Sequence, residues 1–90
     1  MNNVIQLIIS YDGNPISSVT LGKIFGISGT EIRRIVNAAR CDGCPICSCH
    51  KGYYYSENAE DIEHTVQSLQ NRICGIQKAI NGLSVLVGGG

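Results

Sequence analysis

The chain has 90 residues, of which 43% are hydrophobic and 16% are charged, and its formal net charge is zero. This composition indicates one globular domain and excludes a disordered chain. It also excludes a membrane-spanning protein, because no apolar run approaches the roughly 20 residues of a membrane span. The start, MNNVIQLIIS, has no basic region ahead of its apolar residues, so we expect no secretory signal and a cytoplasmic protein with reduced cysteines.

The charges are distributed unevenly along the chain. Residues 1–52 carry five basic and three acidic side chains, a net charge of +2. The remaining residues carry two basic and four acidic side chains, a net charge of −2. An anionic partner is therefore expected to bind the first half of the chain.

The first 26 residues predict two short helices. The apolar run at residues 4–9 fits a helix or a buried strand, and the turn residues YDGNP close it. We expect a helix, because so short an opening strand has no evident partner. Ser17 or Ser18 then caps a second helix, which ends at Gly26. The apolar residues of this second helix are Val19, Leu21, Ile24 and Phe25.

A third helix is predicted to start two residues later. Ser28-Gly29-Thr30-Glu31 forms a capping box, in which the serine oxygen accepts the backbone N–H of Glu31 and the glutamate reaches back. Apolar residues spaced i, i+3, i+4 and i+7 form one stripe, namely Ile32, Ile35, Val36 and Ala39. The outer face of the helix is then polar and basic, with Thr30, Arg33, Arg34, Asn37 and Arg40.

A β-hairpin is predicted after Gly43 and Pro45, which end the third helix. The stretch ICSCHKGYYYS indicates two short strands, at residues 46–49 and 53–55, around a turn at residues 50–52. In the second strand Tyr53 and Tyr55 share one face and Tyr54 points to the other. Either set of tyrosines could pack toward the core.

A long fourth helix is predicted from a cap at Asn58. Its apolar residues alternate at spacings of four and three, which is the pattern of a coiled-coil seam. We expect this helix to pair with a second copy of the chain, although part of the stripe could instead pack on its own domain. The apolar seam consists of Ile62, Val66, Leu69, Ile73, Ile76, Ile80 and Leu83. The expected organisation is thus a domain at residues 1–57, a dimerisation helix at 58–83 and a flexible tail at 84–90.

The order helix, short strand, helix, tight turn, helix, hairpin resembles a winged helix-turn-helix domain. The resemblance covers roughly residues 1–56 and is most specific in PISSVTLGKIFGISGTEIRRIVNAAR and PICSCHKGYYY. These stretches are similar to the DNA-binding domain of biotin-ligase repressors and to small helix-turn-helix proteins of phages and Gram-positive bacteria. The resemblance implies a mainly α fold with a small β-hairpin wing, followed here by a long C-terminal helix. Gly22 departs from the family pattern, which usually has a larger residue there.

The resemblance also implies a role for each part of the domain. Residues 26–28 would be the turn, residues 28–40 the recognition helix, and residues 50–52 the wing tip. A recognition helix reads base edges in the major groove, where arginine can bond guanine and asparagine can bond adenine. Arg40 and Lys51 are expected to contact phosphate. The expected residues for binding double-stranded DNA are Ser28, Thr30, Arg33, Arg34, Asn37, Arg40, His50 and Lys51; alternatively, the arginines only solvate an outer helix face.

A metal site is the main alternative use of the cysteine-rich stretch. Cys44-Pro45-Ile46-Cys47 resembles half of a zinc knuckle, and Cys41, Cys49 or His50 could complete four ligands. A strong zinc signature, however, has two paired motifs, and here there is a single cluster. We therefore expect no metal and no cofactor. Cys74, beside a seam position, is expected to be a small buried residue.

Three functions fit these patterns. The leading hypothesis is a homodimeric transcriptional regulator of phage or mobile-element type that binds double-stranded DNA, with no enzymatic activity, because no catalytic constellation is visible. The first alternative is a winged-helix protein-interaction module, which the zero net charge favours. The second is a metal-responsive regulator that uses the Cys41–His50 cluster. Salt dependence of DNA binding separates the first two, and metal analysis of the reduced protein tests the third.

Overall fold

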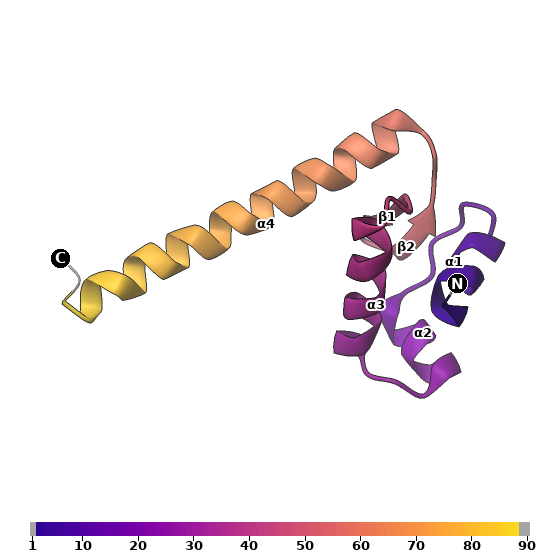
Figure 1. The fold of residues 1–90 in the computed structure, drawn as a ribbon, viewed down its shortest axis with the longest axis horizontal. Helices are drawn as coiled ribbons and strands as arrows, with labels where there is room; N and C mark the ends of the chain where they lie inside the picture. Colours follow the sequence, from indigo (N-terminus) through magenta and orange to yellow (C-terminus); the bar gives the residue numbers. More distant parts are fainter. Residues whose placement is uncertain (1, 89–90) are drawn as a thin grey trace.

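A computed structural model describes residues 2–88 of the chain (Figure 1). Three short helices and a hairpin form one packed domain, and a much longer helix projects from it (Figure 1). The elements are α1 (Asn3–Ser10), α2 (Ser18–Phe25), α3 (Gly29–Cys41), β1 (Ile46–Cys49), β2 (Gly52–Tyr55) and α4 (Ala59–Leu86). Within residues 2–88, no helix is both long enough and apolar enough to cross a membrane.

The ends of the short helices follow local hydrogen bonding. The helix expected at residues 4–9 is confirmed as α1. Ser17 is the N-cap of α2, because its Oγ accepts the backbone N–H of Thr20 at 3.1 Å. Gly26 ends α2 in the left-handed conformation, with φ of 67°. The predicted end of α2 at Gly26 is confirmed, and Ser17 is the cap among the two serines that the sequence offered.

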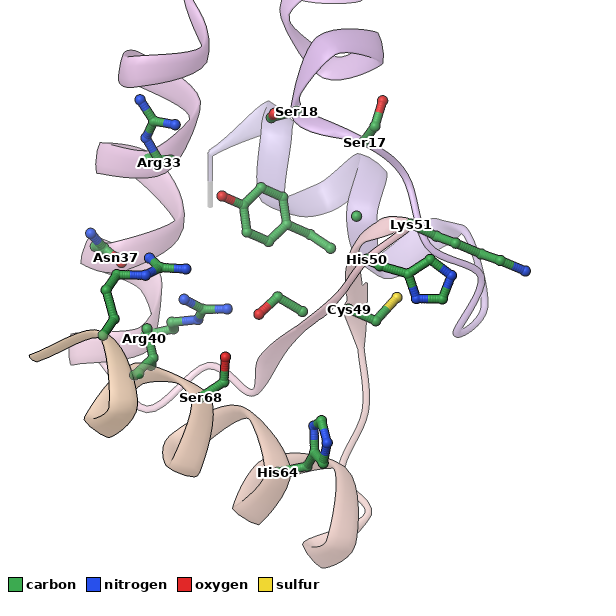
Figure 2. Close-up of a pocket in the computed structure, with 15 residues that line it drawn as sticks. Ser17, Ser18, Arg33, Asn37, Arg40, Cys49, His50, Lys51, His64 and Ser68 are labelled. Atoms are coloured by element: carbon green, nitrogen blue, oxygen red, sulfur yellow. The ribbon is translucent and has the colours of Figure 1, made fainter. Parts of the chain in front are cut away.

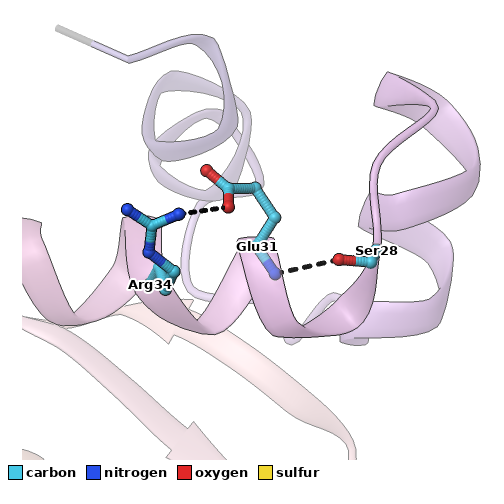
Figure 3. Close-up of polar contacts among 3 residues, drawn as sticks. All are labelled: Ser28, Glu31 and Arg34. Carbon is cyan, nitrogen blue, oxygen red and sulfur yellow. Dashed lines mark hydrogen bonds and ion pairs between the residues drawn. The ribbon is translucent and has the colours of Figure 1, made fainter.

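Only half of the predicted capping box forms at the start of α3 (Figure 3). Ser28 Oγ accepts the backbone N–H of Glu31 at 3.2 Å, as predicted. The Glu31 carboxylate instead accepts a hydrogen bond from Arg34 Nη1 at 2.8 Å. A charged donor one turn along the helix is a stronger partner than a backbone N–H. The predicted return contact from Glu31 to Ser28 is therefore wrong.

The core lies between α1, α2, α3 and the hairpin. Ile32 and Val36 on α3 are fully buried, and the other two members of the predicted stripe are half-buried. The apolar face predicted for α2 is only partly correct, because Val19 is 65% exposed and Ile24 is 53% exposed. This helix has only eight residues, and Leu21 is the one it buries fully.

The hairpin has two strands, and one residue of a third segment pairs with it. The strands pair antiparallel, with Cys49 opposite Gly52, so the tip is a two-residue turn. Ile16 and Tyr53 also exchange backbone hydrogen bonds, at 2.8 and 2.9 Å, which adds the predicted short strand as an isolated bridge. A side chain on Gly52, whose φ is 138°, would collide with the backbone of Ile16. The hairpin therefore requires glycine at this position.

A second close approach explains the glycine in the middle of α2. A Cβ on Gly22 would lie 2.7 Å from the carbonyl oxygen of Ile27. The Ile27 N–H also donates to the Gly22 carbonyl at 3.1 Å. The turn between α2 and α3 folds so tightly over Gly22 that a larger residue would have to displace backbone atoms.

The two tyrosine faces of β2 have different neighbours. Tyr53 and Tyr55 pack against the core, whereas the Tyr54 hydroxyl donates to Asp61 Oδ1 at 3.2 Å. On the neighbouring strand, the backbone N–H of Ser48 donates to the buried Thr65 Oγ1 at 3.3 Å. These bonds hold the first turns of α4 against the hairpin.

The rest of α4 extends away from the domain (Figure 1). It begins at the predicted cap, Asn58, whose side chain accepts the Glu60 N–H at 2.8 Å. It runs to Leu86, three residues beyond Leu83, so the first part of the predicted tail at residues 84–90 is helical. Residues 89–90 of that tail lie outside the described part. Every residue of α4 after Leu69 is exposed.

Candidate functional site

A cleft of about 450 Å³ lies between α3, the hairpin tip and the first half of α4 (Figure 2). In this view the labelled side chains surround one open space, with α3 on one side, the hairpin tip on the other, and α4 below. We call it the basic cleft. Its lining includes Ser17, Ser18, Arg33, Asn37, Arg40, Ser48, Cys49, His50, Lys51, Tyr53, His64, Ser68, Leu69 and Arg72.

The basic cleft has an uncompensated positive charge. Its lining carries three arginines, one lysine and two histidines, and no described residue that lines it is acidic. Within residues 2–88 the only ion pair is formed by Arg34 and Glu31, and neither residue lines the cleft. A chain with zero net charge thus presents one concave surface that attracts anions.

The structure brings together five of the eight residues expected to bind DNA. Arg33, Asn37, Arg40, His50 and Lys51 all line the basic cleft, although they come from α3 and from the hairpin tip. This juxtaposition depends on the hairpin folding back beside α3. The hairpin itself was predicted, but Gly52, expected in a turn at residues 50–52, pairs with Cys49 as the first residue of β2.

The other three expected residues lie on the exposed first turns of α3 and do not line the cleft. Ser28 caps the helix, and Arg34 pairs with Glu31 (Figure 3). Thr30 Oγ1 accepts a hydrogen bond from Arg33 Nη2 at 3.4 Å. Arg33 thus contacts Thr30 one turn before it, and Asn37 lies one turn after it.

Arg40 was expected on the outer face of α3, and this expectation is wrong. Its side chain is half-buried, Nε donates to the Ile46 carbonyl at 2.7 Å, and its guanidinium carbon lies 5.8 Å from the centre of the Tyr53 ring. The long side chain crosses from the last turns of α3 to β1. Burial lowers the pKa of Arg40, and the charge of Arg72 lowers it further, but an arginine remains charged at neutral pH.

Sequence reasoning missed the contribution of α4 to the cleft. His64, Ser68 and Arg72 line it and are spaced i, i+4 and i+8, so they share one helix face. That spacing is visible in the sequence. It does not show that this face meets α3, because the angle at which α4 leaves the hairpin depends on tertiary contacts such as those of Thr65.

The cysteines do not form a common site. Cys47 is only 1% exposed, whereas Cys41 and Cys49 are exposed. Burial raises the pKa of Cys47 and of the half-buried Cys44, which disfavours the thiolate that binds metals. No three His, Cys, Asp or Glu side chains in the described part of the chain are placed to hold a metal ion. Cys74, expected to be buried, is exposed because α4 projects from the domain.

Comparison of the chain with protein-family models, with curated proteins and with solved structures finds no match. The functional interpretation therefore depends on two surfaces, the basic cleft and the apolar seam of α4.

Proposed function

We propose that the protein is a sequence-specific double-stranded DNA-binding protein of the winged helix-turn-helix class, and that it acts as a dimeric transcriptional regulator of phage or mobile-element type. One observation carries the proposal. The polar face of α3 and the hairpin tip meet in a cleft that is rich in cations and has no acidic lining among the described residues. Phosphate contacts from such a surface provide most of the affinity for DNA.

The order of the elements supports the assignment. The α2–turn–α3 unit corresponds to the helix-turn-helix, with α3 as the recognition helix, and the hairpin corresponds to the wing. The backbone exchange between Ile16 and Tyr53 ties the wing to the segment before α2, so the wing has a fixed position beside α3. A fixed wing can contact the DNA backbone while α3 lies in the groove.

The proposal gives different roles to the residues of the cleft. Arg33 and Asn37 are exposed on α3 and read base edges, as arginine does at guanine and asparagine at adenine. Lys51, at the tip of the wing, contacts phosphate and positions the protein without selecting a sequence. Arg34 and Thr30 lie on the same outer face of α3, at its first turns.

The seam of α4 supports a homodimer. In heptad terms the a positions are Val66, Ile73 and Ile80, and the d positions are Ile62, Leu69, Ile76 and Leu83. Residues branched at Cβ fill every a position, and the d positions are divided between leucine and isoleucine, so the seam suits a coiled coil, which we propose to be a parallel pair. Outside the first turns the seam is uncovered in the single chain, where Ile73 is 64% exposed and Leu83 is 65% exposed. We propose a second copy of the chain as its partner.

The alternative, in which the stripe packs on its own domain, describes only the beginning of the helix. Ile62 and Leu69 are half-buried near the hairpin, and Val66 is 46% exposed. The remaining seam residues extend beyond the domain. Parallel pairing of these residues would place two domains at the same end of the coiled coil, which suits an operator with two half-sites.

Salt-dependent binding tests the proposal. The Kd for a labelled mixed-sequence duplex would be measured by fluorescence anisotropy at several salt concentrations. We expect the affinity to fall steeply as salt rises, because each phosphate contact releases counterions. Absence of duplex binding, or binding that does not respond to salt, would contradict the proposal and favour the protein-interaction module.

A further inference from the structure

Two arginines from distant parts of the sequence share the basic cleft. Arg40 belongs to α3 and Arg72 to α4, and both line the cleft. They are close enough for the charge of Arg72 to oppose the charged state of Arg40. Within residues 2–88 neither takes part in an ion pair. The junction between α3 and α4 therefore contains like charges that repel each other.

The guanidinium of Arg40 is only partly satisfied within the domain. Its Nε donates a hydrogen bond to the Ile46 carbonyl, and this contact fixes the side chain at the edge of the cleft. Its Nη2 is buried and has no hydrogen-bond partner among the described residues. Most buried polar groups in native proteins have a partner, and an unmet charged donor is especially unfavourable. The rest of this half-buried side chain lines the cleft and pairs with no acidic side chain of the described residues, so an anion in the cleft would balance its charge.

We propose that Arg40 and Arg72, with the hydroxyl of Ser68, bind a phosphate group, and that the bound phosphate holds α4 in its docked position beside α3. A guanidinium presents parallel N–H donors that match the oxygens of phosphate, and two guanidiniums match its charge. His64 and Lys51 also line the cleft and add donors around it. The cleft is larger than one phosphate ion, so the group could be part of a larger molecule.

This inference adds α4 to the site of the proposed function. If the phosphate belongs to DNA, the inference rests on that function, and the same contact links the direction of the dimerisation helix to DNA binding. If the phosphate belongs to a small solute, the inference is independent of that function. The chemistry is the same in both cases, so the test needs one arm for each source.

The comparison variants are Arg72→Gln and Lys78→Gln. Both residues are exposed cations on α4, but only Arg72 lines the cleft. Each substitution removes one positive charge and leaves the core unchanged. Without phosphate, Arg72→Gln should be at least as stable as the parent chain, because the repulsion with Arg40 is removed. A folding defect would therefore be recognised before binding is measured.

In the first arm, thermal unfolding is followed at constant protein concentration, with inorganic phosphate replacing chloride at equal ionic strength. We expect phosphate to raise the Tm of the parent and of Lys78→Gln, and to leave the Tm of Arg72→Gln unchanged. In the second arm, the affinity for a mixed-sequence duplex is measured. Here Arg72→Gln should weaken binding about tenfold, the loss of one charge-assisted hydrogen bond, and Lys78→Gln should not.

If Arg72→Gln abolishes only the rise of Tm with inorganic phosphate, the site binds a small phosphate. If Arg72→Gln weakens only the binding of the duplex, the site binds the DNA backbone. The proposal is overturned if Arg72→Gln and Lys78→Gln behave alike in both arms. Failure of the proposed function gives a different result. In that case the parent binds no duplex, and the first arm alone decides the inference.

Discussion

The hydroxyl of Tyr54 on β2 donates a hydrogen bond to the carboxylate of Asp61 in the first turn of α4, at 3.2 Å. The same carboxylate accepts a second hydrogen bond from Ser56 Oγ at 2.7 Å. Asp61 thus joins the hairpin, the connecting segment and α4. This small polar contact helps to fix the direction in which α4 leaves the domain.

Tyr54→Phe should therefore lower the free energy of unfolding by about 1 kcal/mol, the usual contribution of one hydrogen bond. Burial raises the pKa of Tyr54, and the charge and hydrogen bond of Asp61 raise it further. A raised pKa means that the folded state favours the neutral phenol, so this stabilisation is present below about pH 10 and is lost as pH rises further. Denaturant unfolding of the parent and of Tyr54→Phe across this range would measure both effects.

Tyr55→Phe is the matched control. The Tyr55 hydroxyl bonds Glu57, only two residues away, and this contact does not involve α4. Its removal should leave the docking of α4 intact. Equal losses of stability in the two variants at neutral pH would contradict a special role for the contact between Tyr54 and Asp61.

Replacing Arg33 or Asn37 with alanine should relax sequence preference at one base pair each. Each substitution should cost about 1–3 kcal/mol of binding free energy on the preferred site, the usual contribution of a bidentate base contact. A panel of duplexes with single base-pair changes would measure the preference at every position. If both variants kept the preferences of the parent, the assignment of α3 as the recognition helix would be wrong.

Lys51→Ala should behave differently, because a phosphate contact carries no sequence information. We expect weaker binding to all duplexes alike and a salt slope that is smaller by about one unit. The measurement is the Kd on preferred and random duplexes over a range of salt concentrations. A change of preference at a single base pair would instead place Lys51 at a base edge.

Charged substitutions at Ile76 and Ile80 should convert a dimer into a folded monomer. These residues are 55% and 50% exposed in the single chain, so the change should not disturb the domain. They are better targets than Leu69, which is half-buried and lines the basic cleft. Sedimentation and circular dichroism would report the oligomeric state and the folding of the variant, and operator binding should weaken strongly.

Val85→Lys provides the control for the seam. Val85 is 65% exposed, as Leu83 is, but it lies two residues beyond a d position and off the apolar stripe. It should remain dimeric. A parent chain that sediments as a monomer at tens of micromolar would contradict the homodimer.

Local signals in the sequence predicted most of the fold. Ser17, Gly26 and Ser28 form hydrogen bonds with the ends of the helices that they cap. The helix boundaries that they set therefore do not depend on distant contacts. The alternation of the tyrosines also predicted that Tyr54 faces away from its neighbours. The alternation could not predict which face of β2 packs against the core, because the packing of that strand depends on the position of α4.

Tertiary contacts explain why the position of Arg40 was predicted wrongly and why Arg72 was missed. Arg40 belongs to the polar set of α3 by its spacing, but its long side chain reaches the Ile46 carbonyl after the hairpin has folded. Arg72 enters the basic cleft only because Thr65 and Asp61 fix the first turns of α4. Periodicity in the sequence shows which residues share a helix face, but it does not show which other element packs against that face. It therefore predicts neither of these two positions.

The central claim is that a dimer reads double-stranded DNA with α3, and selection of bound sequences from a library of random duplexes tests it most directly. We predict enrichment of an inverted pair of half-sites at a fixed spacing, because a parallel coiled coil relates the two recognition helices by twofold symmetry. The enrichment should be lost with Arg33→Ala at the base pair that this residue reads. Recovery of the unselected library, with no sequence enriched after repeated rounds, would contradict the account.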